Sequence, residues 1–151
     1  TGQLHRRAEP MGEGEFHLVV YAWIRGGDGR YLLTKRSPNK GYPNMWECTG
    51  GSALTGDDSL TAALREVREE TGLRLDPMRG RRVASHKVTG RVEDVWLFER
   101  DVALDELTLQ EGETCGAMLA RADEILELQR EGRMAPMGSF ELAELLRLME
   151  G

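Results

Sequence analysis

The chain has 151 residues, about the size of one domain, and its hydrophobic share of 40% is enough for an ordinary core. Its formal charge of -6, from 20 basic and 26 acidic residues, argues against a protein that binds the phosphate backbone of a nucleic acid polymer. No apolar run reaches the roughly 18 residues of a membrane helix, and Cys48 and Cys115 form no disulfide framework, so the composition predicts a cytoplasmic protein with reduced thiols.

The first part of the chain predicts two strands joined by a tight turn. Residues 1–16 are polar and glycine-rich, and we interpret them as an arm or edge segment ahead of a single domain over residues 17–150. Residues 17–24, HLVVYAWI, form a continuous apolar and β-branched run that is typical of a buried strand. Three glycines and an aspartate over 26–29 predict a hairpin turn, so residues 30–36 are expected to be the returning strand.

A loop and a short strand are predicted to follow. Two prolines and a glycine mark residues 37–44 as a loop. Residues 46–49 favour a short strand that leads into the pair Gly50 and Gly51. Two adjacent glycines allow close approach of the backbone to another group, which makes this pair a candidate part of a site.

Residues 59–70 carry the clearest helix pattern, because apolar residues recur there at helical spacing. The predicted inward stripe consists of Leu60, Ala63, Leu64, Val67 and Thr71. Asp57 or Asp58 would cap the start of this helix by accepting hydrogen bonds from free backbone N–H groups. Gly72 would end it in a left-handed conformation.

The second half of the chain predicts further strands and two closing helices. Strands are expected over residues 82–87 and 92–98, weaker strands over 107–109 and 117–119, and amphipathic helices over 122–130 and 140–149. Strands on both sides of a helix, with more helices at the end, predict a layered α/β (α+β) domain.

Three carboxylates converge on the polar side of the predicted helix over 59–70. Glu66 and Glu70 are four residues apart and share one face, and Glu69 lies on the neighbouring row. Each like-charged pair costs roughly 0.2–0.5 kcal/mol, and the C-terminal half of a helix is unfavourable for anions. A bound cation would offset both costs, and oxygen ligands suit Mg²⁺ or Mn²⁺. The alternative is a solvated acidic face neighboured by Arg65 and Arg68.

The flanking residues favour the metal site. The stretch GSALTGDDSLTAALREVREETGL, residues 51–73, resembles the Nudix box: a glycine, five residues, a glutamate, seven residues, then R-E-U-x-E-E-x-G-U, where U is a bulky aliphatic residue. Every fixed position matches except one, since Asp57 stands where the family usually has glutamate. The resemblance extends over about residues 15–150 and implies the Nudix fold, a mixed β-sheet sandwiched between helices.

The resemblance also implies roles for individual residues. Glu66, Glu69 and Glu70 would be the metal ligands, and the carbonyl oxygen of Gly50 would be a further one. Arg65 would orient a box glutamate through a charge-assisted hydrogen bond. Glu66 or Glu69 would accept the proton of the attacking water. The shorter side chain of Asp57 puts its supporting contact in this site in question.

Residues outside the box supply weaker candidates. In some family members a later loop provides the base or an extra ligand, and Glu111 and Glu113 lie at a suitable position for it, although they are equally read as loop charges. Lys35 and Arg36, at a strand end, would contact substrate phosphates or remain solvated. Trp46 would stack on a base or pack beneath the metal loop.

The activity implied is metal-dependent hydrolysis of a phosphoanhydride in a small nucleoside-diphosphate-linked substrate. A bound cation would neutralise phosphate oxygens and lower the pKa of water, and a carboxylate would take the water's proton. The partner expected is therefore a small-molecule diphosphate, with neither a nucleic acid polymer nor a membrane, and dimers are common in the family, so a homodimer stays open.

Two rival functions stay open. The segments HRRAEPMGEGEFHLVVYAWI, LLTKRS and MWECTGG are also similar to the Nudix subgroup related to isopentenyl-diphosphate isomerase. That isomerase needs a cysteine directly before the box glycine, whereas Gly50 stands there and Cys48 is two residues too early. The other rival is a non-catalytic nucleotide-sensing Nudix module, although such modules usually lose box glutamates that are present here.

Overall fold

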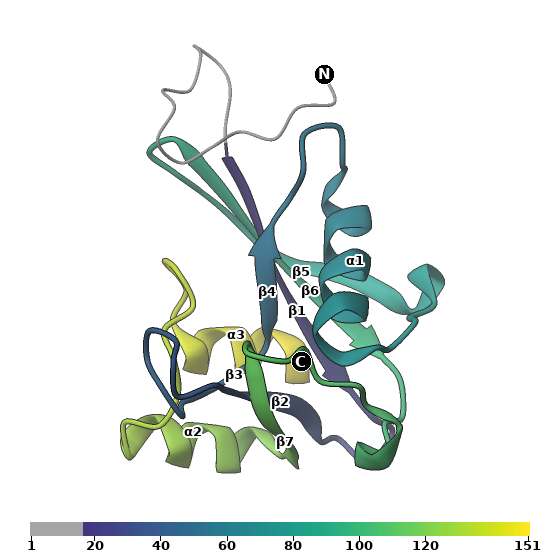
Figure 1. Ribbon diagram of the computed structural model, residues 1–151. Helices are drawn as coiled ribbons and strands as arrows, with labels where there is room; N and C mark the ends of the chain where they lie inside the picture. Colours follow the sequence, from purple (N-terminus) through teal and green to yellow (C-terminus); the bar gives the residue numbers. More distant parts are fainter. Residues whose placement is uncertain (1–16) are drawn as a thin grey trace.

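The computed structural model describes residues 17–151 (Figure 1). The predicted arm over residues 1–16 lies outside the described residues. The strands are β1 (His17–Arg25), β2 (Tyr31–Arg36), β3 (Trp46–Glu47), β4 (Thr49–Ser52), β5 (Gly80–Val88), β6 (Arg91–Glu99) and β7 (Thr114–Ala120). The helices are α1 (Ser59–Thr71), α2 (Ala122–Arg130) and α3 (Leu142–Glu150), with short 3-10 turns at Pro77–Arg79 and Leu104–Glu106.

The seven strands form one mixed sheet. The main path runs β3-β2-β1-β6-β5, while β4 pairs with β1 and β7 pairs with β2. Strand β1 is parallel to β6 along its whole length and antiparallel to β4 over Val19 to Ala22. It pairs with β2 only at Arg25 and Tyr31, so the two strands of the predicted hairpin diverge after the turn. The mixed sheet predicted from the family resemblance is confirmed.

Helices cover both faces of this sheet (Figure 1). One buried cluster joins α1 to the sheet through residues such as Val20, Ala63 and Val67. The other joins α2 and α3 to the opposite face through residues such as Trp23 and Leu145. Burial of a large apolar side chain contributes roughly 1.5–3 kcal/mol, so these two clusters provide the main stabilisation of the domain. Within residues 17–151, no helix combines the length and the apolarity needed to cross a bilayer.

Helix α1 begins and ends as its sequence predicts. The side chain of Asp58 accepts a hydrogen bond from the backbone N–H of Thr61 at 2.7 Å, so Asp58 is the capping residue. Gly72 has φ of 78° and its N–H donates to the carbonyl of Arg68. These two caps fix the length of the helix and therefore the position of the glutamates in its second half.

Two predicted strands differ from the structure, and both differences affect the site. The strand expected over 46–49 is divided into β3 and β4, and β4 contains Gly50 and Gly51. No strand forms over 107–109, because the backbone N–H groups of Thr108 and Gln110 donate to the carbonyls of Thr71 and Glu70 at the end of α1. The segment after residue 107 is therefore held against the helix end rather than in the sheet.

Candidate functional site

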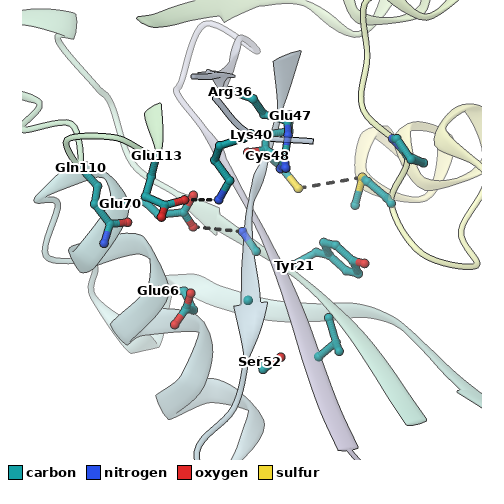
Figure 2. A pocket seen from close by; sticks show the side chains of 15 residues that line it. Tyr21, Arg36, Lys40, Glu47, Cys48, Ser52, Glu66, Glu70, Gln110 and Glu113 are labelled. Carbon is teal, nitrogen blue, oxygen red and sulfur yellow. Dashed lines mark hydrogen bonds and ion pairs between the residues drawn. The ribbon is translucent and has the colours of Figure 1, made fainter. Parts of the chain in front are cut away.

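A cavity of about 450 Å³ opens between the end of α1, strand β4 and three loops (Figure 2). Glu66 and Glu70 enter it from α1, and Gly50 and Gly51 from β4. Its remaining polar wall includes Arg36, Lys40, Glu47, Ser52, Gln110 and Glu113. Four carboxylates therefore share this cavity with two basic side chains.

Glu70 is the most strongly perturbed of these carboxylates. Burial raises the pKa of Glu70 to about 8, and the negative charges of Glu47 and Glu66 add to the effect. Its carboxylate accepts a hydrogen bond from the N–H of Gly50 at 3.3 Å (Figure 2). No ion pair joins Glu70 to a basic residue within the part of the chain that the structure describes. Among the residues described, the positive charge of Lys40 lowers this pKa only in part, and no ion pair neutralises the ionised form of Glu70.

Glu66 has a similar but weaker perturbation. Its pKa is raised by burial first and by the charge of Glu69 second. The Nη2 atom of Arg65 lies 3.7 Å from the Glu66 carboxylate. Burial also raises the pKa of Glu47, although Arg36 donates to this carboxylate at 2.9 Å. Crowded, partly buried carboxylates of this kind favour uptake of a cation.

Glu69 does not join the other two box glutamates. Its side chain is 45% exposed and lies 4.0 Å from Nε of Arg65, on the outer side of the helix. The helical twist explains this, because Glu66 and Glu70 are separated by about 40° around the axis whereas Glu69 and Glu70 are about 100° apart. In this conformation two of the three box carboxylates, Glu66 and Glu70, line the cavity, and Glu69 as a metal ligand stays a prediction.

No three His, Cys, Asp or Glu side chains among residues 17–151 are close enough together to hold a metal ion as they stand. The donor set nevertheless fits an oxygen-liganded divalent cation, since the partly buried carboxylates of Glu66 and Glu70 line one cavity and burial raises the pKa of both. Gly50 contributes its N–H to Glu70 here, while its carbonyl as a ligand stays a prediction.

The two glycines of β4 make room for the side chains around them. A Cβ added to Gly51 would collide with the Glu66 carboxylate, and one added to Gly50 would lie 2.9 Å from Cδ1 of Tyr21. Lack of space, rather than backbone conformation, favours glycine at both positions, because neither residue has a positive φ. The pair therefore allows α1 to approach the sheet closely enough for Glu66 to enter the cavity.

Asp57 reaches Arg65 despite its short side chain. Its carboxylate accepts from Nη1 of Arg65 and, at 3.1 Å, from the backbone N–H of Leu54. The hydrogen bond from Arg65 is the main cause of a lowered Asp57 pKa. Arg65 also donates to the carbonyl of Ser52 at 3.4 Å, so the pair ties the loop before α1 to the helix.

Only some of the other predicted substrate-binding and base residues line the cavity. Arg36 and Glu113 line the cavity, whereas Lys35, Trp46 and Glu111 do not. The ammonium of Lys35 lies over the Trp46 ring at 5.8 Å from its centroid, and Trp46 packs against a core cluster with its indole N–H buried. Packing is the role that this geometry favours for Trp46.

Several cavity residues were not anticipated from the sequence: Val19, Tyr21, Lys40, Glu47, Cys48, Gln110 and Met137. The alternation of β1 could have indicated Val19 and Tyr21, since they point away from buried Val20 and Ala22. Cys48 is only 4% exposed, its Sγ lies 3.9 Å from Sδ of Met137, and burial raises the pKa of its thiol. No periodicity or motif in the sequence indicates that Lys40, Glu47 and Gln110 line the cavity.

Comparisons with known proteins agree with this architecture. The sequence matches the NUDIX domain model over residues 15–139. An uncharacterized Nudix hydrolase of Listeria monocytogenes is 37% identical over 150 residues, covering 98% of this chain and 88% of that protein. A CTP pyrophosphohydrolase of Escherichia coli is 36% identical over 77 residues, covering 50% of this chain and 56% of that protein. A crystal structure from Deinococcus radiodurans has a TM-score of 0.73 and 25% identity, covering 95% of this chain and 88% of that chain.

Proposed function

Because this chain belongs to the Nudix family and is a hydrolase acting on pyrophosphate bonds, we propose that its cavity binds a small nucleoside-diphosphate-linked substrate together with Mg²⁺ or Mn²⁺. The observation that carries the proposal is the burial of Glu70 beside Glu66 and Glu47, with no ion pair to Glu70 from the described residues. A carboxylate in this position is stabilised in its ionised form by a neighbouring cation.

Glu66 and Glu70 would hold the cation, with Glu69 and the Gly50 carbonyl as further candidates. Divalent cations neutralise phosphate oxygens and lower the pKa of bound water in reactions of this class. Arg65, fixed by Asp57, would keep the Glu66 side chain in place through the contact at 3.7 Å. Turning Glu69 inward would require a change of its rotamer, which its 45% exposure leaves room for.

A proton must leave the attacking water, and Glu66 is the favoured acceptor. Its carboxylate faces the cavity, while Glu69 faces solvent. Glu113 is the alternative base or ligand, because it lines the same cavity.

The substrate class follows from the two sides of the cavity. Arg36 and Lys40 offer positive charge to a diphosphate, and Val19, Tyr21 and Met137 offer a less polar wall to the rest of the molecule. The Escherichia coli relative acts on CTP, as its name states, which supports a nucleoside phosphate. Trp46 and Lys35 would take part only after a rearrangement, since neither lines the cavity.

The test is a panel of nucleoside triphosphates, nucleotide sugars, dinucleoside polyphosphates and coenzyme diphosphates with Mg²⁺ or Mn²⁺. We expect release of phosphate, pyrophosphate or a nucleoside monophosphate, and a fall of at least about 10²-fold in turnover for Glu70→Gln. Equal activity of this variant would remove the helix from the mechanism. Tight nucleotide binding without any turnover would instead support the sensing module, and conversion of isopentenyl diphosphate to its dimethylallyl isomer would support the isomerase.

A further inference from the structure

Lys40 brings an ammonium group into the carboxylate cavity from the loop between β2 and β3. Its Nζ donates to Oε2 of Glu113 (Figure 2). The positive charge of Lys40 also lowers the pKa of Glu70 and of Glu47, so this ammonium acts on three carboxylates at once. Lys40 is therefore placed among the groups that would meet an incoming cation.

The backbone around Lys40 is anchored by hydrogen bonds, whereas its side chain is held by an accessible ion pair with Glu113. The N–H of Ser37 donates to the carbonyl of Glu113 at 3.1 Å, and the N–H of Lys40 donates to the carbonyl of Ser37 at 3.1 Å. The side chains of Lys40 and Glu113 are 32% and 43% exposed. An ion pair that is this accessible contributes only about 0–1 kcal/mol, so Lys40 can change partner at little cost without movement of the loop.

Arg36 differs from Lys40 in this respect. It donates to Glu47 at 2.9 Å and to the carbonyl of Gly41 at 2.6 Å, which holds its planar guanidinium at two points. Lysine has a single point charge on a flexible stem. Of the two basic residues in the cavity, Lys40 is thus the one suited to exchange partners.

We propose that Lys40 is the resting counter-ion of the cavity, and that it leaves Glu113 for a phosphate oxygen of the substrate when a divalent cation enters. The inference rests on the proposed function for its cation. The Lys40 ammonium near Glu70 repels a divalent cation that binds there. A diphosphate attracts both the ammonium and the cation. Lys40 consequently weakens binding of the cation alone and strengthens binding of the cation together with a diphosphate.

The experiment measures binding rather than turnover. Mn²⁺ is titrated calorimetrically into the wild type and Lys40→Met without substrate, and methylenediphosphonate is then titrated in the presence of Mn²⁺. We expect Lys40→Met to bind Mn²⁺ at least about five-fold more tightly and the diphosphonate at least about five-fold more weakly, the lower end of typical coupling between sites. Arg130→Met, which removes one charge from an exposed pair with Glu127 on α2, is the matched control and should change neither affinity.

An unchanged or weaker Mn²⁺ affinity in Lys40→Met would overturn the proposal, as would an unchanged diphosphonate affinity. Absence of Mn²⁺ binding to the wild type would overturn the proposed function as well, and this result is distinct from the other two. Thermal unfolding of both variants establishes that the fold is retained, which the half-buried position of Lys40 and the exposed position of Arg130 favour.

Discussion

At the scale of single residues, the Glu66 carboxylate leaves no room for a side chain at Gly51. A methyl group there would occupy the position of the Glu66 carboxylate, which is the far end of a flexible side chain. Gly51→Ala is therefore expected to displace Glu66 without unfolding the protein. We predict a loss of at least about ten-fold in turnover, from a misplaced catalytic group, and a change of less than about 1 kcal/mol in the free energy of unfolding.

Steady-state kinetics and urea unfolding measure these two effects separately. Gly41→Ala is the control, because a Cβ at Gly41 meets nothing within 4 Å and its φ is not positive. If Gly51→Ala retained full activity, the close approach of β4 to Glu66 would have no catalytic importance.

Asp57 tests whether the family's usual glutamate is required at this position. Its carboxylate already accepts from Arg65 and from the backbone of Leu54. We predict that Asp57→Ala lowers the melting temperature by about 2–4 °C, the effect of about 1 kcal/mol in a domain of this size, and reduces activity, whereas Asp57→Glu preserves both. Differential scanning calorimetry decides the point, and an Asp57→Ala protein that melts at the wild-type temperature would contradict it.

At the scale of elements, the last helix is attached to the sheet through Tyr31. This fully buried side chain donates to Glu150 of α3 and accepts from Arg25, which also donates to the carbonyl of Met149 at 2.7 Å. Tyr31→Phe removes the hydroxyl and is expected to lower the free energy of unfolding by about 1–2 kcal/mol. Urea unfolding checks this value, with Tyr42→Phe as a control because Tyr42 is 54% exposed.

Tyr31 also makes the free energy of unfolding fall at high pH. Burial, followed by the hydrogen bond to Glu150, raises the pKa of Tyr31 to about 12 from a usual value of 10.0. The unfolded chain then loses this proton first as the pH rises, so the contribution of Tyr31 is complete below pH 10 and is lost towards pH 12. Ultraviolet titration should show less absorbance change near pH 12 in Tyr31→Phe than in the wild type, and identical titration curves would contradict the assignment.

Elements with a clear periodicity were predictable from the sequence, and those without it were not. The helical spacing over residues 59–70 and the β-branched run over 17–24 gave their elements to within one residue at each end. Strand β4 was missed because glycines have low strand propensity, although their pairing with β1 makes them a strand. The expected strand over 107–109 was wrong because its backbone pairs with the end of α1.

At the scale of the whole molecule, the cavity exists because segments far apart in the sequence meet at one end of α1. The box glutamates were predictable, since their identity and spacing lie within one helix. Lys40, Glu47 and Glu113 were harder to place, because a loop, a two-residue strand and a turn carry them to the site. Their positions depend on sheet pairing and on the hydrogen bond from Gln110 to the helix end, neither of which has a local signal.

The proposed hydrolysis depends on a divalent cation bound by carboxylates of this cavity, and calorimetric titration with Mn²⁺ tests this binding most directly. Titrations of the wild type, Glu66→Gln and Glu70→Gln at one pH and salt concentration compare isosteric side chains that differ in charge. We predict binding to the wild type and an affinity at least about ten-fold lower in each variant, the scale of losing one charged ligand. Equal affinities in all three proteins, or no binding to the wild type, would contradict it.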